Sequence, residues 1–221
     1  MERALVIGAS GGIGSALSAA IAAKGSAVTG VSRSRDGLDL TDEASIARVL
    51  GALEGSFDTV IVATGALELG AHKPEKSLRT ANAEALAAQF ALNATGPLLV
   101  LKHAVRLMPR DKPVRFAALS ARVGSISDNA VGGWYSYRAA KAALNQLIHT
   151  AAIEIARSHP LSVVVTLHPG TVDTGLTANY RGGHAAMPTS VAAEHLLTVL
   201  NQLTPAQTGQ FFDWQGAQVP W

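Results

Sequence analysis

The chain has 221 residues, which is long enough for one sizeable core and short for two independent domains. Its formal net charge of +2 is too small to indicate a nucleic-acid partner, and the lack of cysteine excludes disulfides, thiolate metal sites and cysteine nucleophiles. The seven histidines show no HxxxH or HExxH spacing, so we expect no metal site.

The sequence also bears on the cellular compartment. The opening Met-Glu-Arg leads into an apolar run shorter than the core of a signal peptide. We find no stretch of about 18 apolar residues free of polar or charged interruption, so no membrane span is expected. These features predict a cytoplasmic protein.

Strand-like and helix-like segments alternate along the chain. Short β-rich runs predict strands at 4–7, 27–31, 58–63, 114–120, 161–167 and 210–212. Helical patterns cover 13–24, 41–53 with Thr41 as N-cap, 81–108 with a kink or break at Pro97, 134–158 and 190–203. Buried strands separated by helices indicate a parallel sheet with helices on both faces. We therefore predict one doubly wound, Rossmann-type α/β domain over residues 1–221, with about seven strands and its ligand crevice at their carboxyl ends.

A glycine-rich turn joins the first strand to the first helix. It reads Gly8-Ala9-Ser10-Gly11-Gly12-Ile13-Gly14, a GxxxGxG spacing that only approximates the generic dinucleotide fingerprint. Glycines here allow a sharp turn and bring the helix N-terminus close to a pyrophosphate, whose charge the free amides would hold. The turn predicts a dinucleotide site that includes Ser10 and Ile13.

The same turn also satisfies GxSxG, the nucleophile elbow of serine hydrolases, with Ser10 as nucleophile. Such an elbow follows several strands, because one oxyanion amide comes from an earlier loop. Here the turn follows the first strand, which favours the dinucleotide interpretation.

The end of the second strand bears on which dinucleotide binds. An NAD site usually has an acidic residue about 20 residues after the fingerprint, to accept from the ribose hydroxyls. This chain has Ser32 and Arg33 there, with Arg35 close behind. A guanidinium can hold a 2′-phosphate, so the sequence favours NADP(H) over NAD(H), and an exposed surface arginine is the alternative.

Tyr137 and Lys141 form a YxxxK spacing within a predicted helix. Residues four apart share a helix face, so the phenol and the ammonium can enter one crevice. A nearby cation would lower the phenol pKa from about 10, making Tyr137 a candidate acid/base for a carbonyl or alcohol. Tyr135 and Tyr180 lack such a lysine.

Five motifs in order resemble the short-chain dehydrogenase/reductases over essentially the whole chain. They are Gly8-x3-Gly12-x-Gly14, Leu38 to Asp42, Asn93 before Gly96, Tyr137-x3-Lys141, and Pro169 to Thr174. The segments GGWYSYRAAKAALN and GQFFDWQG look like the C-factor-type subgroup of small reductases.

The resemblance implies roles for individual residues. Asp39 and Leu40 would contact the adenine, and Asn93 would hold a water in a proton relay behind Lys141. Lys141 would also bind the nicotinamide ribose. The segment Pro169, Gly170, Thr171, Val172, Asp173 and Thr174 would hold the carboxamide, with Val172 and Thr174 nearest. A homodimer or homotetramer is the family's usual assembly.

The chain departs from the family pattern in two places. The usual Asn-Asn-Ala-Gly appears as Val62-Ala63-Thr64-Gly65, which keeps the cofactor-side position without the amides. When the chain is aligned directly with the family pattern, Ala121 occupies the position of the catalytic serine. Neighbouring strand residues point to opposite faces, so Ser120 needs a bulge or shift to substitute. We take Ser120 as the catalytic serine and leave Ser125 as a second candidate.

The leading hypothesis is thus an NADP(H)-dependent oxidoreductase that moves a hydride between nicotinamide and a small carbonyl or alcohol substrate. The alternatives are a catalytically degraded nucleotide-binding signalling protein, which Ala121 motivates, and a serine hydrolase using Ser10. A short substrate lid is expected between Thr174 and Met187, made mobile by Gly182-Gly183.

Overall fold

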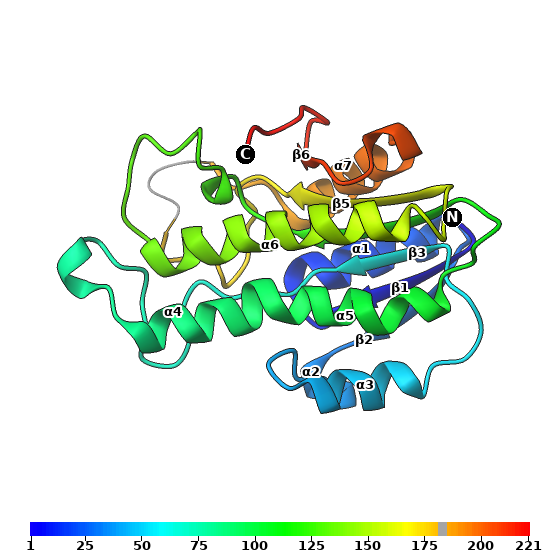
Figure 1. The fold of residues 1–221 in the computed structure, drawn as a ribbon, viewed down its shortest axis with the longest axis horizontal. Coiled ribbons are helices and arrows are strands. Elements are labelled where there is room, and N and C mark those ends of the chain that lie inside the picture. The colour runs from blue at the N-terminus through cyan, green and yellow to red at the C-terminus, as the bar shows by residue number, and fades with distance from the viewer. Residues whose placement is uncertain (181–184) are drawn as a thin grey trace.

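The computed structural model describes residues 1–180 and 185–221, so the glycine pair expected in the lid lies outside the described residues. Helices and strands alternate as predicted (Figure 1). The strands are β1 (Arg3–Ile7), β2 (Ala27–Val31), β3 (Thr59–Val62), β4 (Val114–Leu119), β5 (Ser162–His168) and β6 (Phe211–Asp213). The helices are α1 (Gly12–Ala23), α2 (Arg33–Asp36), α3 (Glu43–Gly51), α4 (Ala83–Phe90), α5 (Gly96–Ala104), α6 (Tyr135–Ile155) and α7 (Thr189–Gln202).

The six strands of the described residues form one parallel sheet in the order β2-β1-β3-β4-β5-β6. The order reverses between β1 and β3, the topological switch point where ligands bind in such sheets. The prediction of about seven strands is wrong. Residues 32–58, which cross from β2 to β3, form only α2 and α3, so nothing in them extends the sheet beyond β2.

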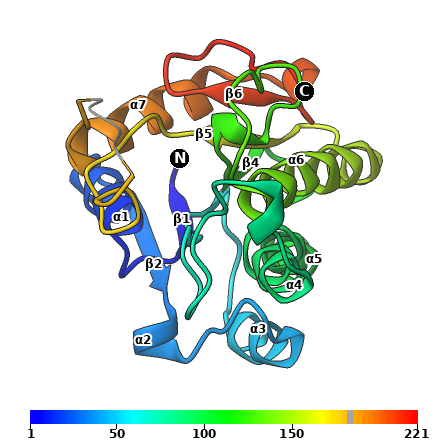
Figure 2. The same cartoon turned by 90° about the vertical axis from the view of Figure 1, so that its left-hand side faces the viewer.

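Helices cover both faces of the sheet (Figure 2). Two hydrophobic clusters fill the space between the sheet and these helices. Alternate residues of each strand face opposite sides. On β1, Leu5 and Ile7 pack in the cluster with α3, α5 and α6, whereas Ala4 and Val6 pack in the cluster with α1 and α7. The near-continuous burial of β1, β3, β4 and β5 explains why their sequences lack polar alternation.

The predicted helix at 81–108 is a composite that does not break at Pro97. A π-helical segment, Ala91–Thr95, joins α4 to α5, and the helix ends in a 3₁₀ turn at Val105–Leu107. Proline lacks an amide donor and clashes with the carbonyl four residues back, and the wider π turn before Pro97 accommodates both defects.

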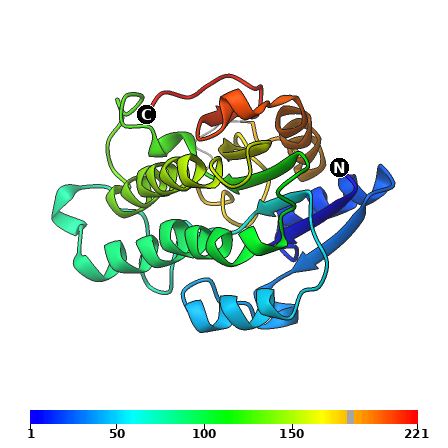
Figure 3. The ribbon, with the colours of Figure 1, turned by 45° about the vertical axis from the view of Figure 1, so that its right-hand side comes forward.

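By length and composition the composite helix, Ala83–Leu107, could cross a membrane, which the sequence did not indicate. In this fold 44% of its apolar window is buried. The helix packs between α3 and α6, and α5 runs beside α6 (Figure 3).

The prediction that Thr41 caps the next helix is wrong. Asp42 is the N-cap of α3, and its side chain accepts from the Ala44 amide at 3.0 Å. Thr41 instead donates its hydroxyl and its amide to Asp39. The remaining predicted boundaries agree within three residues. Among the described residues, the short α2 and the 3₁₀ turns at Leu78–Thr80, Arg122–Gly124 and Pro205–Gln207 were not predicted.

Candidate active site

The glycine turn packs so tightly that side chains are excluded. Gly8 has a φ of +87°, and a Cβ on Gly14 would lie 2.1 Å from the Gly8 carbonyl oxygen. The residues described provide no side-chain cap for α1, whose N-cap is Gly11. Gly11, Gly12 and Ile13 line a cavity of about 670 Å³, so the positive end of α1 faces that space.

The cavity lies at the carboxyl ends of the strands, at the switch point. It is bounded by α1, by the segments that follow β3, β4 and β5, and by the first turns of α6. Most of the predicted site residues line it: Gly12, Ile13, Ala63, Thr64, Gly65, Ser120, Tyr137, Lys141, Pro169, Gly170, Thr171, Val172 and Thr174.

Tyr137 and Lys141 lie on the buried face of α6. Lys141 Nζ donates to the Leu119 carbonyl at 2.8 Å and lies 5.8 Å from the centre of the Tyr137 ring. Burial raises the pKa of the Tyr137 phenol and lowers the pKa of Lys141 to about 7. The expected lowering of the phenol pKa by the lysine is therefore wrong for this arrangement, because loss of water disfavours the charged form of each group.

Ser120 continues β4 without a bulge. Its amide donates to the Leu167 carbonyl at 2.8 Å, and its hydroxyl donates to Asn145 Oδ1 at 2.7 Å. Asn145 follows Tyr137 by two helical turns on the same face of α6, and sequence reasoning did not single it out. The next residue, Ala121, also lines the cavity.

Ser125 does not fold back into the cavity lining. Its side chain is buried, and its hydroxyl accepts from the Asp128 amide at 3.2 Å. The hydroxyl stabilises the loop before α6. Its local hydrogen bond explains its burial without a role at the cavity.

Asn93 is fully buried in the π segment, behind the cavity wall. Its side-chain amide pairs with the Ala66 backbone, accepting at 3.2 Å and donating at 2.9 Å. A Cβ on Gly65 would lie 2.8 Å from Asn93 Oδ1 and 3.6 Å from Lys141 Nζ. Glycine at position 65 therefore allows the lysine and the asparagine to approach the same point.

The predicted adenine-side residues lie outside the cavity lining. Asp39 accepts two hydrogen bonds from Thr41, which lower its carboxyl pKa. Leu40 is buried, and a Cβ on Gly96 would meet it at 2.8 Å. Both residues thus have local structural roles.

The end of β2 leads into the short helix α2. The Ser32 amide donates to Asp36 Oδ2 at 2.7 Å, and the Arg33 side chain is exposed. Arg35 reaches back to the Gly30 carbonyl and lies 3.6 Å from the Asp36 carboxylate. Arg33 thus extends into solvent beyond the carboxyl end of β2.

Ser10 is exposed and also lies outside the cavity lining. The turn that holds it follows β1, the first strand of the chain. Its position gives no support to the serine-hydrolase alternative.

The cavity has further polar and aromatic residues that sequence reasoning missed. Trp134 lies edge-on to both Tyr137 and Tyr180, at 6.4 and 5.6 Å between ring centres, and the Tyr180 hydroxyl donates to Glu68. His168 ends β5 beside Pro169, and burial lowers its pKa to about 4. No regular spacing links these residues to the motifs, so only the fold brings them together.

A glycine turn at the switch point of a parallel sheet, with a Tyr–Lys pair across the cavity, defines a Rossmann-type oxidoreductase. A family model described as enoyl-(acyl carrier protein) reductase matches residues 37–210. The chain belongs to the short-chain dehydrogenase/reductase family.

Individual relatives agree with this assignment. C-signal of Myxococcus xanthus is 35% identical over 136 residues, which cover 62% of this chain and 78% of that protein. The 1-hydroxy-2-glutathionyl-2-methyl-3-butene dehydrogenase of Rhodococcus sp. strain AD45 is 29% identical over 192 residues, covering 84% and 79%.

Solved structures share the fold over the whole chain. The NADPH-bound carbonyl reductase from chicken fatty liver has a TM-score of 0.85 at 21% identity, covering 100% of this chain and 99% of that one. Carbonyl reductase Sniffer of D. melanogaster has a TM-score of 0.81 at 18% identity, covering 100% of both chains. These similarities show the architecture.

Proposed function

We propose that this enzyme is an NADP(H)-dependent reductase or dehydrogenase that interconverts a carbonyl and an alcohol. The observation that carries the proposal is the buried Tyr137–Lys141 pair, which faces a cavity at the switch point together with the N-terminus of α1. A buried phenol keeps its proton until a stronger base, such as a developing alkoxide, forms beside it.

The residues around the cavity suit a dinucleotide. The first-turn amides of α1 would hold the pyrophosphate, and Thr64 Oγ1 is buried there without a partner in the described residues. Gly12 leaves the space beside Thr174 open, since a Cβ there would lie 3.2 Å from Thr174 Cγ2. The segment Pro169–Thr174 would hold the carboxamide. When bound, the nicotinamide supplies or accepts the hydride.

Arg33 supports the preference for NADP(H). Its side chain lies at the carboxyl end of β2, where the adenosine ribose binds in such folds. The NADPH-bound carbonyl reductase from chicken fatty liver has the same fold.

In the proposed reduction, Tyr137 donates its hydroxyl proton to the substrate oxygen. Lys141, whose pKa is near 7, would return a proton toward the phenol and hold the ribose hydroxyls, with Asn93 behind it. The single Ser120 hydroxyl proton is already engaged in the hydrogen bond that Ser120 donates to Asn145 Oδ1. A flip of the Asn145 amide would turn Nδ2, which lacks a partner in the described residues, toward Ser120 and free the serine proton for the substrate.

The decisive experiment compares Tyr137→Phe with Tyr135→Phe, a partly exposed tyrosine on the same helix. With NADPH and a panel of small ketones and aldehydes, we expect Tyr137→Phe to lower kcat about a hundredfold or more, because it removes the acid. Tyr135→Phe should match the wild type. Equal turnover by wild type and Tyr137→Phe would refute the mechanism.

Ala121 supports a second candidate, a nucleotide-binding protein without turnover. Such a protein would bind NADPH and oxidise none of it with any carbonyl tested. Oxidation of NADPH that depends on Tyr137 excludes this candidate.

We also propose assembly into a homodimer or homotetramer. Phe90 on α4 is 37% exposed and Ile153 on α6 is 52% exposed, so apolar side chains are available on the outer helical layer. Sedimentation equilibrium gives the mass, and a monomer at micromolar concentration would contradict this proposal.

A further inference from the structure

Glu75 has a buried carboxylate and lies apart from the predicted motifs along the chain. It lies in the segment between β3 and α4 and is only 4% exposed. One of its oxygens, Oε1, has no hydrogen-bond partner in the described part of the chain. A buried, half-satisfied carboxylate lowers the stability of a fold, so its presence needs a physical reason.

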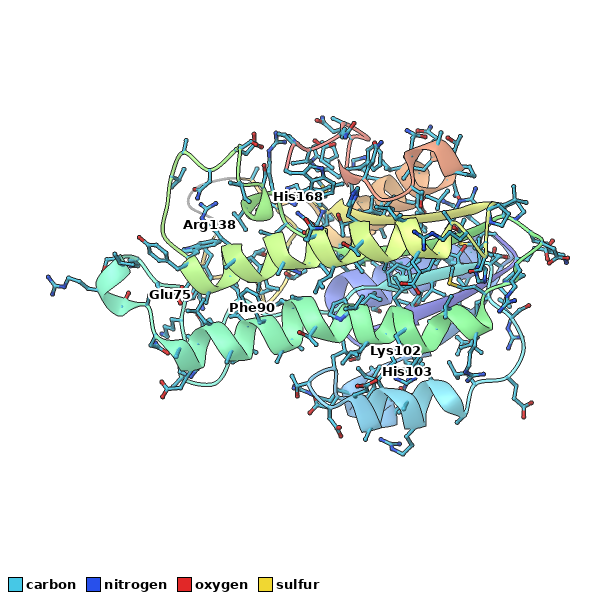
Figure 4. All side chains as sticks on the ribbon, viewed as in Figure 1. Glu75, Phe90, Lys102, His103, Arg138 and His168 are labelled. Carbon is cyan, nitrogen blue, oxygen red and sulfur yellow. The ribbon has the colours of Figure 1, made fainter. Side chains whose placement is uncertain are left out.

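Within the described residues, the hydrogen bonds that Glu75 accepts come from the start of α6. Its main-chain carbonyl accepts from the Trp134 amide at 2.6 Å, and its Oε2 accepts from the Ser136 amide at 3.2 Å. Figure 4 shows Glu75 at this end of α6, with Arg138 on the first turn of the same helix. One residue therefore accepts from two of the amides that an α-helix leaves free at its N-terminus.

The local sequence cannot cap α6 by itself. The N-cap residue, Trp134, has a left-handed φ of +53° and makes no side-chain cap hydrogen bond. Gly133, which precedes Trp134, lies against Glu75, since a Cβ on Gly133 would be 3.3 Å from the Glu75 carbonyl oxygen. Glu75 thus acts as the cap, 61 residues away along the chain.

The capped turn contains the proposed acid. Tyr137 directly follows Ser136, whose amide Glu75 holds, and Trp134 packs edge-on against the Tyr137 ring. On the other side, Arg138 donates to the carbonyls of Val123, Gly132 and Gly133. Loss of the Glu75 contact would remove the acceptor of the Ser136 amide and leave Arg138 as a remaining polar anchor of this turn.

We propose that Glu75 is a positioning residue that holds the first turn of α6 and so sets where the Tyr137 hydroxyl lies in the cavity. The inference rests on the proposed function of Tyr137. A small displacement of a reacting group costs up to about a hundredfold in rate, so the effect belongs in kcat.

The test uses the whole chain with NADPH and a ketone that the wild type reduces. Glu75→Ala removes the acceptor, Glu75→Asp withdraws it by one methylene, and Glu75→Gln keeps an acceptor oxygen at the same reach. Glu84→Ala is the matched control, since Glu84 is exposed in the first turn of α4. The readouts are kcat, substrate KM, NADPH Kd and hydrogen exchange at the Ser136 amide.

We expect Glu75→Ala and Glu75→Asp to lower kcat about ten- to a hundredfold, with NADPH Kd and substrate KM within about twofold of wild type. Exchange at Ser136 should accelerate at least about tenfold in both, because the amide loses its acceptor. Glu75→Gln should restore both properties, and Glu84→Ala should change neither.

Wild-type kcat in Glu75→Asp, or unchanged Ser136 exchange in both variants that remove the contact, would overturn the proposal. If Glu75→Ala does not fold, the Asp and Gln variants decide the question. A failure of the proposed function gives a different result. Turnover would then not depend on Tyr137, whereas hydrogen exchange at Ser136 would still show whether Glu75 holds that amide.

Discussion

The Lys141 ammonium lies where water does not solvate it, 3% exposed and bonded to a main-chain carbonyl. A carbonyl offers a dipole but no counter-charge, so burial dominates and the pKa of Lys141 drops to about 7. The pKa of the neighbouring Tyr137 phenol is raised, because burial disfavours its charged form as well. Near neutral pH the phenol therefore keeps its proton while Lys141 is only partly charged, so the lysine can both supply a proton to the phenol and take one up.

This shift predicts a pH dependence of stability. Between pH 7 and about 10.5 the unfolded chain binds a proton at Lys141 that the folded chain lacks, so the free energy of unfolding rises with pH. The slope from this group is at most about 1.4 kcal/mol per pH unit. Below pH 7 the lysine is charged in both states, and its burial cost is fully present.

Urea unfolding between pH 6.5 and 9.5 checks this prediction. The wild type should gain stability with rising pH relative to Lys141→Met, which keeps the apolar stem and removes the charge. Parallel stability curves for the two proteins would show that Lys141 keeps an ordinary pKa in the fold.

At the scale of elements, close backbone contacts connect the strands to the helices of the site. The turn between β1 and α1 closes on itself at Gly8 and Gly14. The 3₁₀ turn after β4 closes on α6, since a Cβ on Gly124 would lie 2.8 Å from the backbone of Lys141. Backbone cannot yield as a flexible side chain does, so these glycines set how near the elements approach.

Gly14→Ala and Gly51→Ala test this point as a matched pair. Gly14→Ala places a methyl 2.1 Å from the Gly8 carbonyl, and we expect a loss of about 2 kcal/mol or more and weaker NADPH binding. Gly51 is at the end of α3 with open space around it, so Gly51→Ala should be neutral or stabilise by up to about 1 kcal/mol. Thermal unfolding with and without NADPH measures both effects, and equal losses would contradict the steric argument.

For the whole molecule, the switch point is what assembles the site. The strand order reverses between β1 and β3, so the connections after these two strands run to opposite faces of the sheet. A crevice forms between them at the carboxyl ends of the strands. The segments that follow β3, β4 and β5 then line one cavity together with α1 and α6. A ligand in that cavity contacts both halves of the sheet and should stabilise the fold as a unit.

Thermal shift with dinucleotides tests this at the molecular scale. At a hundred times its Kd, NADPH adds about 2.7 kcal/mol, or roughly 5–10 °C in Tm for a chain of this size. We expect a smaller shift with NADH at equal concentration, and Arg33→Ala should remove the difference, since it deletes the 2′-phosphate partner. A larger shift with NADH in the wild type would defeat the Arg33 argument.

The sequence by itself determined the alternation of strands and helices, the position of the glycine turn and the Tyr137–Lys141 pair, because periodicity and i, i+4 spacing are local properties. It could not determine the strand number or the π segment before Pro97, which depend on how the crossovers pack. Tertiary structure alone decided that Ser120 bonds to Asn145, that Leu40 is buried under Gly96, and that Glu75 caps α6. These contacts join residues far apart in the chain, and their partners share no spacing that a single sequence could reveal.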